Sequence, residues 1–97
     1  MKNDIWSEEE LILVLDAYLN EGANADDEDK KVSELSEKME RSKGSIALRV
    51  ANFRHLNPLD DVEGMGNGGK HCERVWKKYR DQRHKLKEKA EKIRHDS

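Results

Sequence analysis

The sequence predicts an all-α fold, with a three-helix helix-turn-helix core and a long fourth helix at the C-terminus. Apolar residues recur at the three- and four-residue spacing of a helix in four segments. Serine or glycine residues stand at the ends of several of these segments, as helix caps do. No segment alternates apolar and polar residues in the manner of a strand. The 97 residues allow one domain, 1–97, whose core we expect over about residues 5–82.

The first helix is expected at about 7–20. Ser7 and Glu10 form a capping-box pattern, in which each side chain accepts a hydrogen bond from a backbone N–H group at the helix start. Trp6 precedes this cap and is placed to pack against the following turn as a hydrophobic staple. Gly22 follows the last apolar turn, where glycine most often ends a helix.

The next two helices are expected at roughly 28–40 and about 43–56, separated by a very short break. Ser42 is the N-cap candidate for the third helix, and Asn57 before a proline is disfavoured in a helix, so the helix stops there. The apolar positions of the second helix are Val32, Leu35 and Met39. Those of the third helix are Ile46, Ala47, Val50 and Phe53.

After a loop at 57–70, a final helix is expected at about 71–94. Its apolar positions follow the four- and three-residue spacing of a coiled coil, but Arg83 interrupts that seam. We therefore expect the basic end, 83–97, to project and fray. This end is either a plain solvated helix or a surface for weak homodimerisation or DNA-backbone contact. The seam positions are Cys72, Trp76, Tyr79, Leu86, Ala90 and Ile93.

Composition limits where the chain works. Charged residues make up 41% of the chain, and the longest apolar run, 11–15, is far too short to span a membrane. The N-terminus lacks the pattern of a signal peptide. The single cysteine, Cys72, excludes an internal disulfide and suits a reducing compartment. We expect a monomer or weak homodimer in the cytoplasm, with no membrane contact.

Charge is distributed unevenly along the chain. Residues 1–40 hold 4 Lys or Arg against 13 Asp or Glu, whereas residues 41–97 hold 15 against 8. The segment 41–58 has four basic residues and no acidic one. Such a chain often presents a basic face to a polyanion, although two solvated helix faces of opposite sign would give the same pattern.

Several of these residues resemble a known family. The chain is similar to the Myb/SANT-like helix-turn-helix in Trp6, in Val32-Ser33-Glu34-Leu35, and in Arg41-Ser42-Lys43-Gly44-Ser45-Ile46 with Arg49 and Phe53. A narrower resemblance, over about residues 5–80, is to the DNA-recognition domains that precede the nuclease in McrA-type HNH restriction endonucleases. Its three blocks are Ile5 to Leu13, Ser45 to Pro58, and Gly64 to Lys70 followed by Val75-Trp76-Lys77-Lys78-Tyr79.

The resemblance implies an all-α domain that binds duplex DNA, in some members with modified cytosines, in restriction or in transcription-type regulation. No His-Asn-His nuclease motif follows, so a nuclease partner would be another chain or domain. From the residues themselves, Arg49 could pair with guanine and Asn52 with adenine from one face of the third helix. Phosphate contacts are assigned to Lys43, Ser45 and Lys70, and Arg41 completes the basic segment. The expected DNA-binding residues are Arg41, Lys43, Ser45, Arg49, Asn52 and Lys70.

Other chemistry is disfavoured. The stretch Gly64 to Lys70 is close to a phosphate-binding loop, but His71 stands where that loop needs Ser or Thr, and no strand precedes it. The histidines and Cys72 match no zinc-finger spacing. The sequence offers no nucleophile–base pair, so we expect no enzyme, cofactor or metal. The competing interpretation is a SANT-like protein-interaction module that does not read DNA and uses the acidic residues of 1–40.

Overall fold

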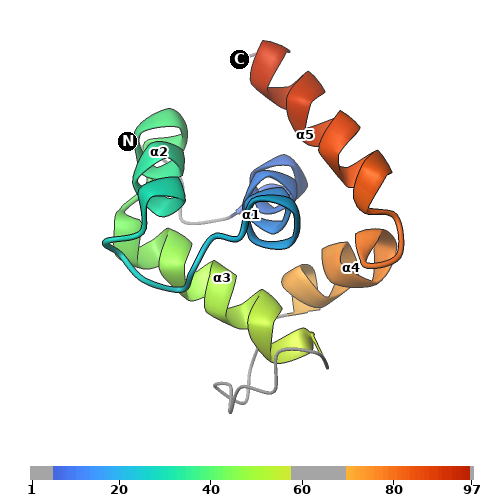
Figure 1. Ribbon diagram of the computed structural model, residues 1–97, viewed down its shortest axis with the longest axis horizontal. Helices are drawn as coiled ribbons and strands as arrows, with labels where there is room; N and C mark the ends of the chain where they lie inside the picture. The colour runs from blue at the N-terminus through green and yellow to red at the C-terminus, as the bar shows by residue number, and fades with distance from the viewer. Residues whose placement is uncertain (1–5, 58–69, 97) are drawn as a thin grey trace.

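The computed structural model describes residues 6–57 and 70–96, and these ranges form five helices without a strand, which confirms the all-α class (Figure 1). The helices are α1 (Glu8–Glu21), α2 (Lys30–Met39), α3 (Lys43–Leu56), α4 (Lys70–Tyr79) and α5 (Arg83–Asp96). Figure 1 shows α1 almost end-on in the middle of the molecule, with the other four helices around it.

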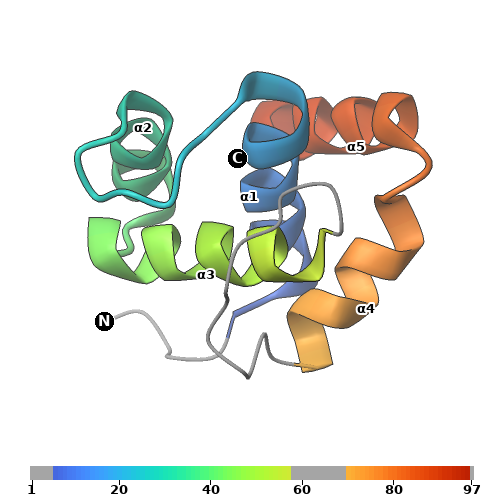
Figure 2. The same cartoon turned by 60° about the horizontal axis from the view of Figure 1, so that its bottom comes forward.

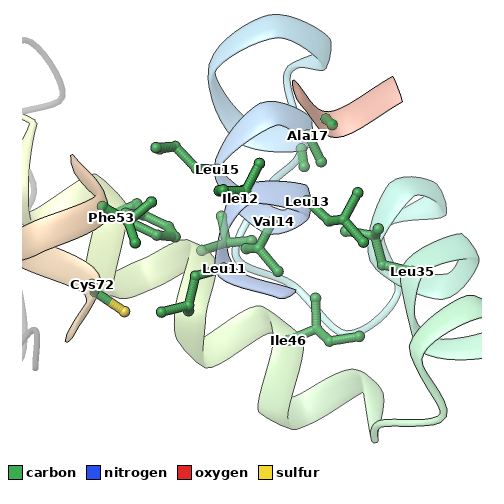
Figure 3. Packing of buried hydrophobic residues seen from close by; sticks show 14 of the residues in the cluster. Leu11, Ile12, Leu13, Val14, Leu15, Ala17, Leu35, Ile46, Phe53 and Cys72 are labelled. Carbon is green, nitrogen blue, oxygen red and sulfur yellow. The ribbon is translucent and has the colours of Figure 1, made fainter. Parts of the chain in front are cut away.

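The central helix, α1, is buried without interruption from Leu11 to Ala17. A helix that is apolar on every side must be surrounded by other elements, and α1 packs against all four other helices. Figure 3 shows its side chains spreading toward Leu35 of α2 on one side and toward Phe53 of α3 on the other. The core therefore wraps α1 instead of lying along one face of it.

The local signals at the ends of α1 behave as expected. Ser7 accepts a hydrogen bond from the Glu10 N–H, and the Glu10 carboxylate accepts one from the Ser7 N–H, each at 3.1 Å, so the capping box is complete. Gly22 has the left-handed φ of 73° that ends a helix with little strain when no Cβ is present. Trp6 and Trp76 are both buried and belong to the hydrophobic core.

Helix α2 is shorter than expected because its N-cap is Asp29. The Asp29 carboxylate accepts hydrogen bonds from the N–H groups of Lys31 at 2.9 Å and Val32 at 3.2 Å. Burial acts to raise the pKa of Asp29, but these N–H groups and that of Asn24 outweigh burial and hold the pKa below 3.8. Helix α3 has the predicted bounds, and Ser42 is its N-cap.

The prediction of one long fourth helix at about 71–94 is wrong, because the chain bends at residues 80–82 and forms two helices. A straight helix would carry Leu86 and Ala90 away from α1, whereas the bend returns both to the core, where they are fully buried. The core therefore extends beyond residue 82, and 83–97 is not a projecting end over its described part, 83–96. The apolar seam offered for dimerisation faces α1 of the same chain.

Polar contacts hold α5 against α1. Asp16 is 0% exposed, and its Oδ2 accepts a hydrogen bond at 3.2 Å from the Arg94 guanidinium, near the end of α5. The Asn20 amide bridges to the Asp16 carboxylate at 2.8 Å and to the carbonyl of Arg83, at the start of α5, at 3.2 Å. Both ends of α5 are therefore fixed to α1. Within the described residues, no helix has the length and apolarity needed to cross a membrane.

Candidate nucleic-acid interface

The connection between α2 and α3 is a tight turn of residues 40–42. Glu40 ends α2 in the left-handed conformation, with φ of 56° and ψ of 39°. The Ser36 hydroxyl donates a 2.5 Å hydrogen bond to the Arg41 carbonyl, and the Ser42 hydroxyl accepts the Ser45 N–H at 3.1 Å. The turn is thus fixed by side chains on both sides, so α3 has a defined direction relative to α2.

Arg41, expected at the DNA surface, is a structural residue in this fold. Its Nε lies 2.6 Å from Oε2 of Glu10 and its Nη2 lies 3.1 Å from Oε1, which is a two-bond ion pair. Its side chain is only 8% exposed and its guanidinium lies 4.4 Å from the centre of the Trp6 ring. The guanidinium ties the α2–α3 turn to the start of α1, so Arg41 is withdrawn from the expected site.

Arg49 is directed to the same tryptophan. Its guanidinium lies 4.8 Å from the centre of the Trp6 ring, and its side chain is half-buried. Stacking of this kind stabilises a cation and also fixes its direction. Arg49 therefore lies on the flank of α3 next to Trp6, half-buried instead of open to a DNA base as expected.

Asn52, expected to read adenine, is a buried residue. It is 9% exposed, and its amide lies 4.0 Å from the Cys72 sulfur on α4. Burial raises the pKa of the Cys72 thiol above its ordinary value, and the Asn52 amide and the Arg49 charge only partly oppose this. Asn52 therefore fastens α3 to α4. The expectation that it shares an exposed face with Arg49 is wrong because α4 covers that flank of α3.

The remaining expected residues lie at helix starts. Lys43 is exposed at the first position of α3, and half-buried Ser45, at the third position, donates its N–H to the hydroxyl of the preceding N-cap, Ser42. Lys70 is exposed at the first position of α4. The glycines from Gly64 to Gly69, assigned a phosphate contact together with Lys70, lie outside the described residues.

The surface of α3 that is open to solvent combines small and apolar residues with one histidine. Gly44, Leu48 and His55 are exposed, with Ala47 and Ala51 half-buried beside them. Leu48, at 37% exposure, is the most exposed large hydrophobic side chain in the described part of the chain. Residues 46, 50 and 53 on the opposite face are fully buried. The sequence contained a signal for this open face, since the small residues recur three and four apart. The predicted DNA surface was instead based on the basic residues.

Helix α4 lies beside the C-terminal half of α3, as Figure 2 shows, and presents a basic face to solvent. Lys70, Arg74 and Lys77 line a hollow of about 390 Å³ together with Glu73. Glu73 is paired with Lys77 at 3.0 Å, which leaves a net positive surface. Sequence reasoning had assigned only Lys70 here, because the side of α4 that faces solvent depends on where α3 and α1 lie.

Two kinds of chemistry are available to this surface: charge attraction by Lys43 and the α4 cations, and apolar contact by the open face of α3. Among residues 6–57 and 70–96, no group of three or more His, Cys, Asp or Glu side chains is arranged to hold a metal ion. Comparison of the chain with models of protein families, with curated proteins and with solved structures finds no match.

Proposed function

We propose that the protein binds duplex DNA, with α2 and α3 acting as a helix-turn-helix and α3 entering the major groove. The observation that supports this most strongly is the hydrogen-bonded α2–α3 turn together with the exposure of Gly44, Leu48 and His55 along one face of α3. In helix-turn-helix proteins the second helix reads base edges in the major groove, while neighbouring elements contact the phosphates.

Phosphate contacts are assigned to cations that the fold leaves exposed. Lys43 stands at the N-terminus of α3, where the helix dipole adds to its charge. Lys70, Arg74 and Lys77 form the basic face of α4, next to α3. Arg74 and Lys77 thus join the expected Lys43 and Lys70, whereas Arg41 and Asn52 leave the proposed interface because both are held inside the fold.

The open face of α3 favours base contacts that are apolar. Small residues at Gly44, Ala47 and Ala51 would let the helix approach the groove closely, and Leu48 would then meet C5-methyl groups on the pyrimidines that carry them. Thymine carries a C5-methyl group in the major groove, and a C5-methylated cytosine carries its methyl group at the same ring position. We therefore propose that methylated cytosine binds more tightly than cytosine at the contacted position.

Fluorescence anisotropy with a labelled duplex of about 20 base pairs tests this proposal. Affinity should fall steeply with salt, and Lys43→Gln should lower the slope of log affinity against log salt by about one. Lys30→Gln, an exposed lysine at the start of α2, is the matched control and should leave the slope unchanged. Micromolar duplex that gives no anisotropy change at about 50 mM salt would refute duplex binding.

The methyl preference has its own test. Leu48→Ala should reduce the ratio of methylated to unmethylated affinity by about fourfold, the value of roughly one buried methyl group. The unmethylated duplex is the internal control, and a thermal melt checks that the variant is folded. Equal affinities of the parent protein for both duplexes, across several sequence contexts, would contradict the methyl contact.

A protein-interaction module remains the second candidate, and an acidic surface favours it. Exposed acidic side chains gather on the loop before α2 and on α2 itself, at Asp26, Asp27, Glu28, Glu34, Glu37 and Glu40. Such a surface would attract a basic protein segment and repel DNA. The same anisotropy experiment with a labelled oligolysine peptide separates the candidates: binding of the peptide without binding of duplex would favour this one.

A further inference from the structure

The junction of α4 and α5 contains a second basic hollow, separate from the proposed α3 interface. It has a volume of about 370 Å³, and four lysines line it: Lys78 from α4, and Lys85, Lys89 and Lys92 from α5. The buried Tyr79 forms part of its apolar wall. The bend at residues 80–82 creates this hollow, because it turns α5 back beside the end of α4.

The three α5 lysines form a continuous stripe. Their spacing of four and three residues puts them on one side of the helix, and they cover about 10 Å along its axis. All three are exposed. Like charges at this spacing destabilise a helix, and none of the three has an acidic partner among the described residues. The fold therefore keeps an unfavourable cluster of positive charge that an anion would relieve.

The other charges of the hollow leave its sign unchanged. Glu88, the one acidic residue among the described residues that line the hollow, is opposed by four lysines and also lies 3.1 Å from the His84 ring nitrogen, an ion pair when the histidine is protonated. Lys78 lies 3.8 Å from Glu8 and 5.4 Å from the centre of the Tyr79 ring, and it is half exposed. Its ammonium therefore stays at the edge of the hollow, where a ligand can reach it.

We propose that this hollow binds a run of about three phosphate groups. Successive phosphates of a nucleic-acid strand advance by about 3.4 Å along the helix axis, so three of them span about 7 Å, which fits within the lysine stripe of about 10 Å. Each lysine supplies a compact point charge, so a row of lysines suits a row of separate anionic groups such as successive phosphates. A free oligophosphate and a nucleic-acid backbone both present this chemistry.

The test compares two variants of the full chain with equal changes of charge. One variant combines Lys85→Gln, Lys89→Gln and Lys92→Gln in the hollow. The control combines Lys30→Gln, Lys38→Gln and Lys87→Gln, which are exposed lysines outside it. Glutamine has nearly the helix propensity of lysine, and all six positions are solvent-exposed, so both variants should fold, as thermal melts would verify.

Sodium tripolyphosphate is the first probe, titrated by calorimetry at about 20 mM salt, where screening is weak. The hollow variant should bind it about tenfold more weakly than the parent, because three exposed ion pairs each contribute a factor of about two to three. The control variant should bind it like the parent. Citrate should bind the parent more weakly than tripolyphosphate. Citrate binding as tight as that of tripolyphosphate, or equal losses in the two variants, would overturn the inference.

Duplex DNA is the second probe and identifies the source of the phosphates. A backbone ligand would lower the salt slope of the hollow variant by about 2.7 relative to the parent, since each lost phosphate contact contributes about 0.9. An unchanged slope together with weakened tripolyphosphate binding would identify a free oligophosphate. A parent protein that binds neither probe overturns the inference, whereas loss of duplex binding alone overturns only the proposed function.

Discussion

The contact between Asp16 and Arg94 gives the sharpest test of the fold, because it decides whether α5 belongs to the core. Arg94→Gln removes the guanidinium that lies 3.2 Å from the buried carboxylate. The Asn20 amide, at 2.8 Å, would remain as the partner of Asp16. The variant thus leaves a buried carboxylate with one hydrogen bond in place of a charged partner.

The expected cost follows from burial. Removing one partner of a fully buried ion pair costs about 3–5 kcal/mol. The Asp16 side chain is 0% exposed, but that of Arg94 is 28% exposed, so water can approach the vacated position. We therefore expect about 2 kcal/mol, below that range, and a melting temperature about 10 °C lower for a chain of this size.

Thermal unfolding monitored by circular dichroism provides the assay. Arg83→Gln changes the same charge at an exposed position of the same helix and should melt within about 2 °C of the parent. The double variant with Asp16→Asn should lose less stability than the two single changes together, by about 1–2 kcal/mol. If Arg94→Gln has the same melting temperature as Arg83→Gln, the docking of α5 on α1 is refuted.

Four further outcomes are expected. Removing residues 83–97 should uncover apolar surface on α1 and replace the cooperative melt with a broad transition; a sharp melt at the parent's temperature would contradict this. Arg41→Lys should lose its two-bond contact with Glu10, so its free energy of unfolding in urea should be about 1 kcal/mol lower than the parent's. The salt slope of DNA binding should stay unchanged. Cys72 should resist a thiol reagent until the chain unfolds, because the thiol is buried and burial raises its pKa. The folded chain disfavours the thiolate, so the free energy of unfolding should fall as the pH rises above about 9, where the unfolded thiol ionises. Asp29→Ala should cost about 1 kcal/mol near neutral pH. The melting temperatures of the variant and the parent should converge as the pH falls below about 4, because protonation of Asp29 removes the stability that its ionised carboxylate gives the parent.

Features that depend on neighbouring residues in the chain could be predicted. The capping box of Ser7 and Glu10, the left-handed Gly22 and the Ser42 cap involve residues within a few positions of each other, so the sequence contains all the information needed. The bounds of α3 follow from Ser42 and from Asn57 before a proline for the same reason. The burial of Ile46, Val50 and Phe53 in α3 follows from helical periodicity. Periodicity was wrong for Ala47, which is half-buried on the open face, and for Asn52, which is buried.

The break between α4 and α5 could not be predicted, because Tyr79 and Leu86 are seven residues apart and so fit one continuous heptad pattern. Only the position of α1, which Leu86 covers after the bend, makes two helices more favourable than one. The absence of glycine and proline at residues 80–82 removed the usual sequence signal of a break.

The candidate site shows the same division. The sequence determined that basic residues follow Arg41 and that small residues share a face of α3, since both are matters of order and spacing. It could not determine that the Arg41 guanidinium would pair with Glu10 and stack on Trp6, both far earlier in the chain, or that α4 would cover Asn52. A polar side chain is available to a ligand only if no other element of the fold reaches it first, and that competition is decided by the packing of helices distant in sequence.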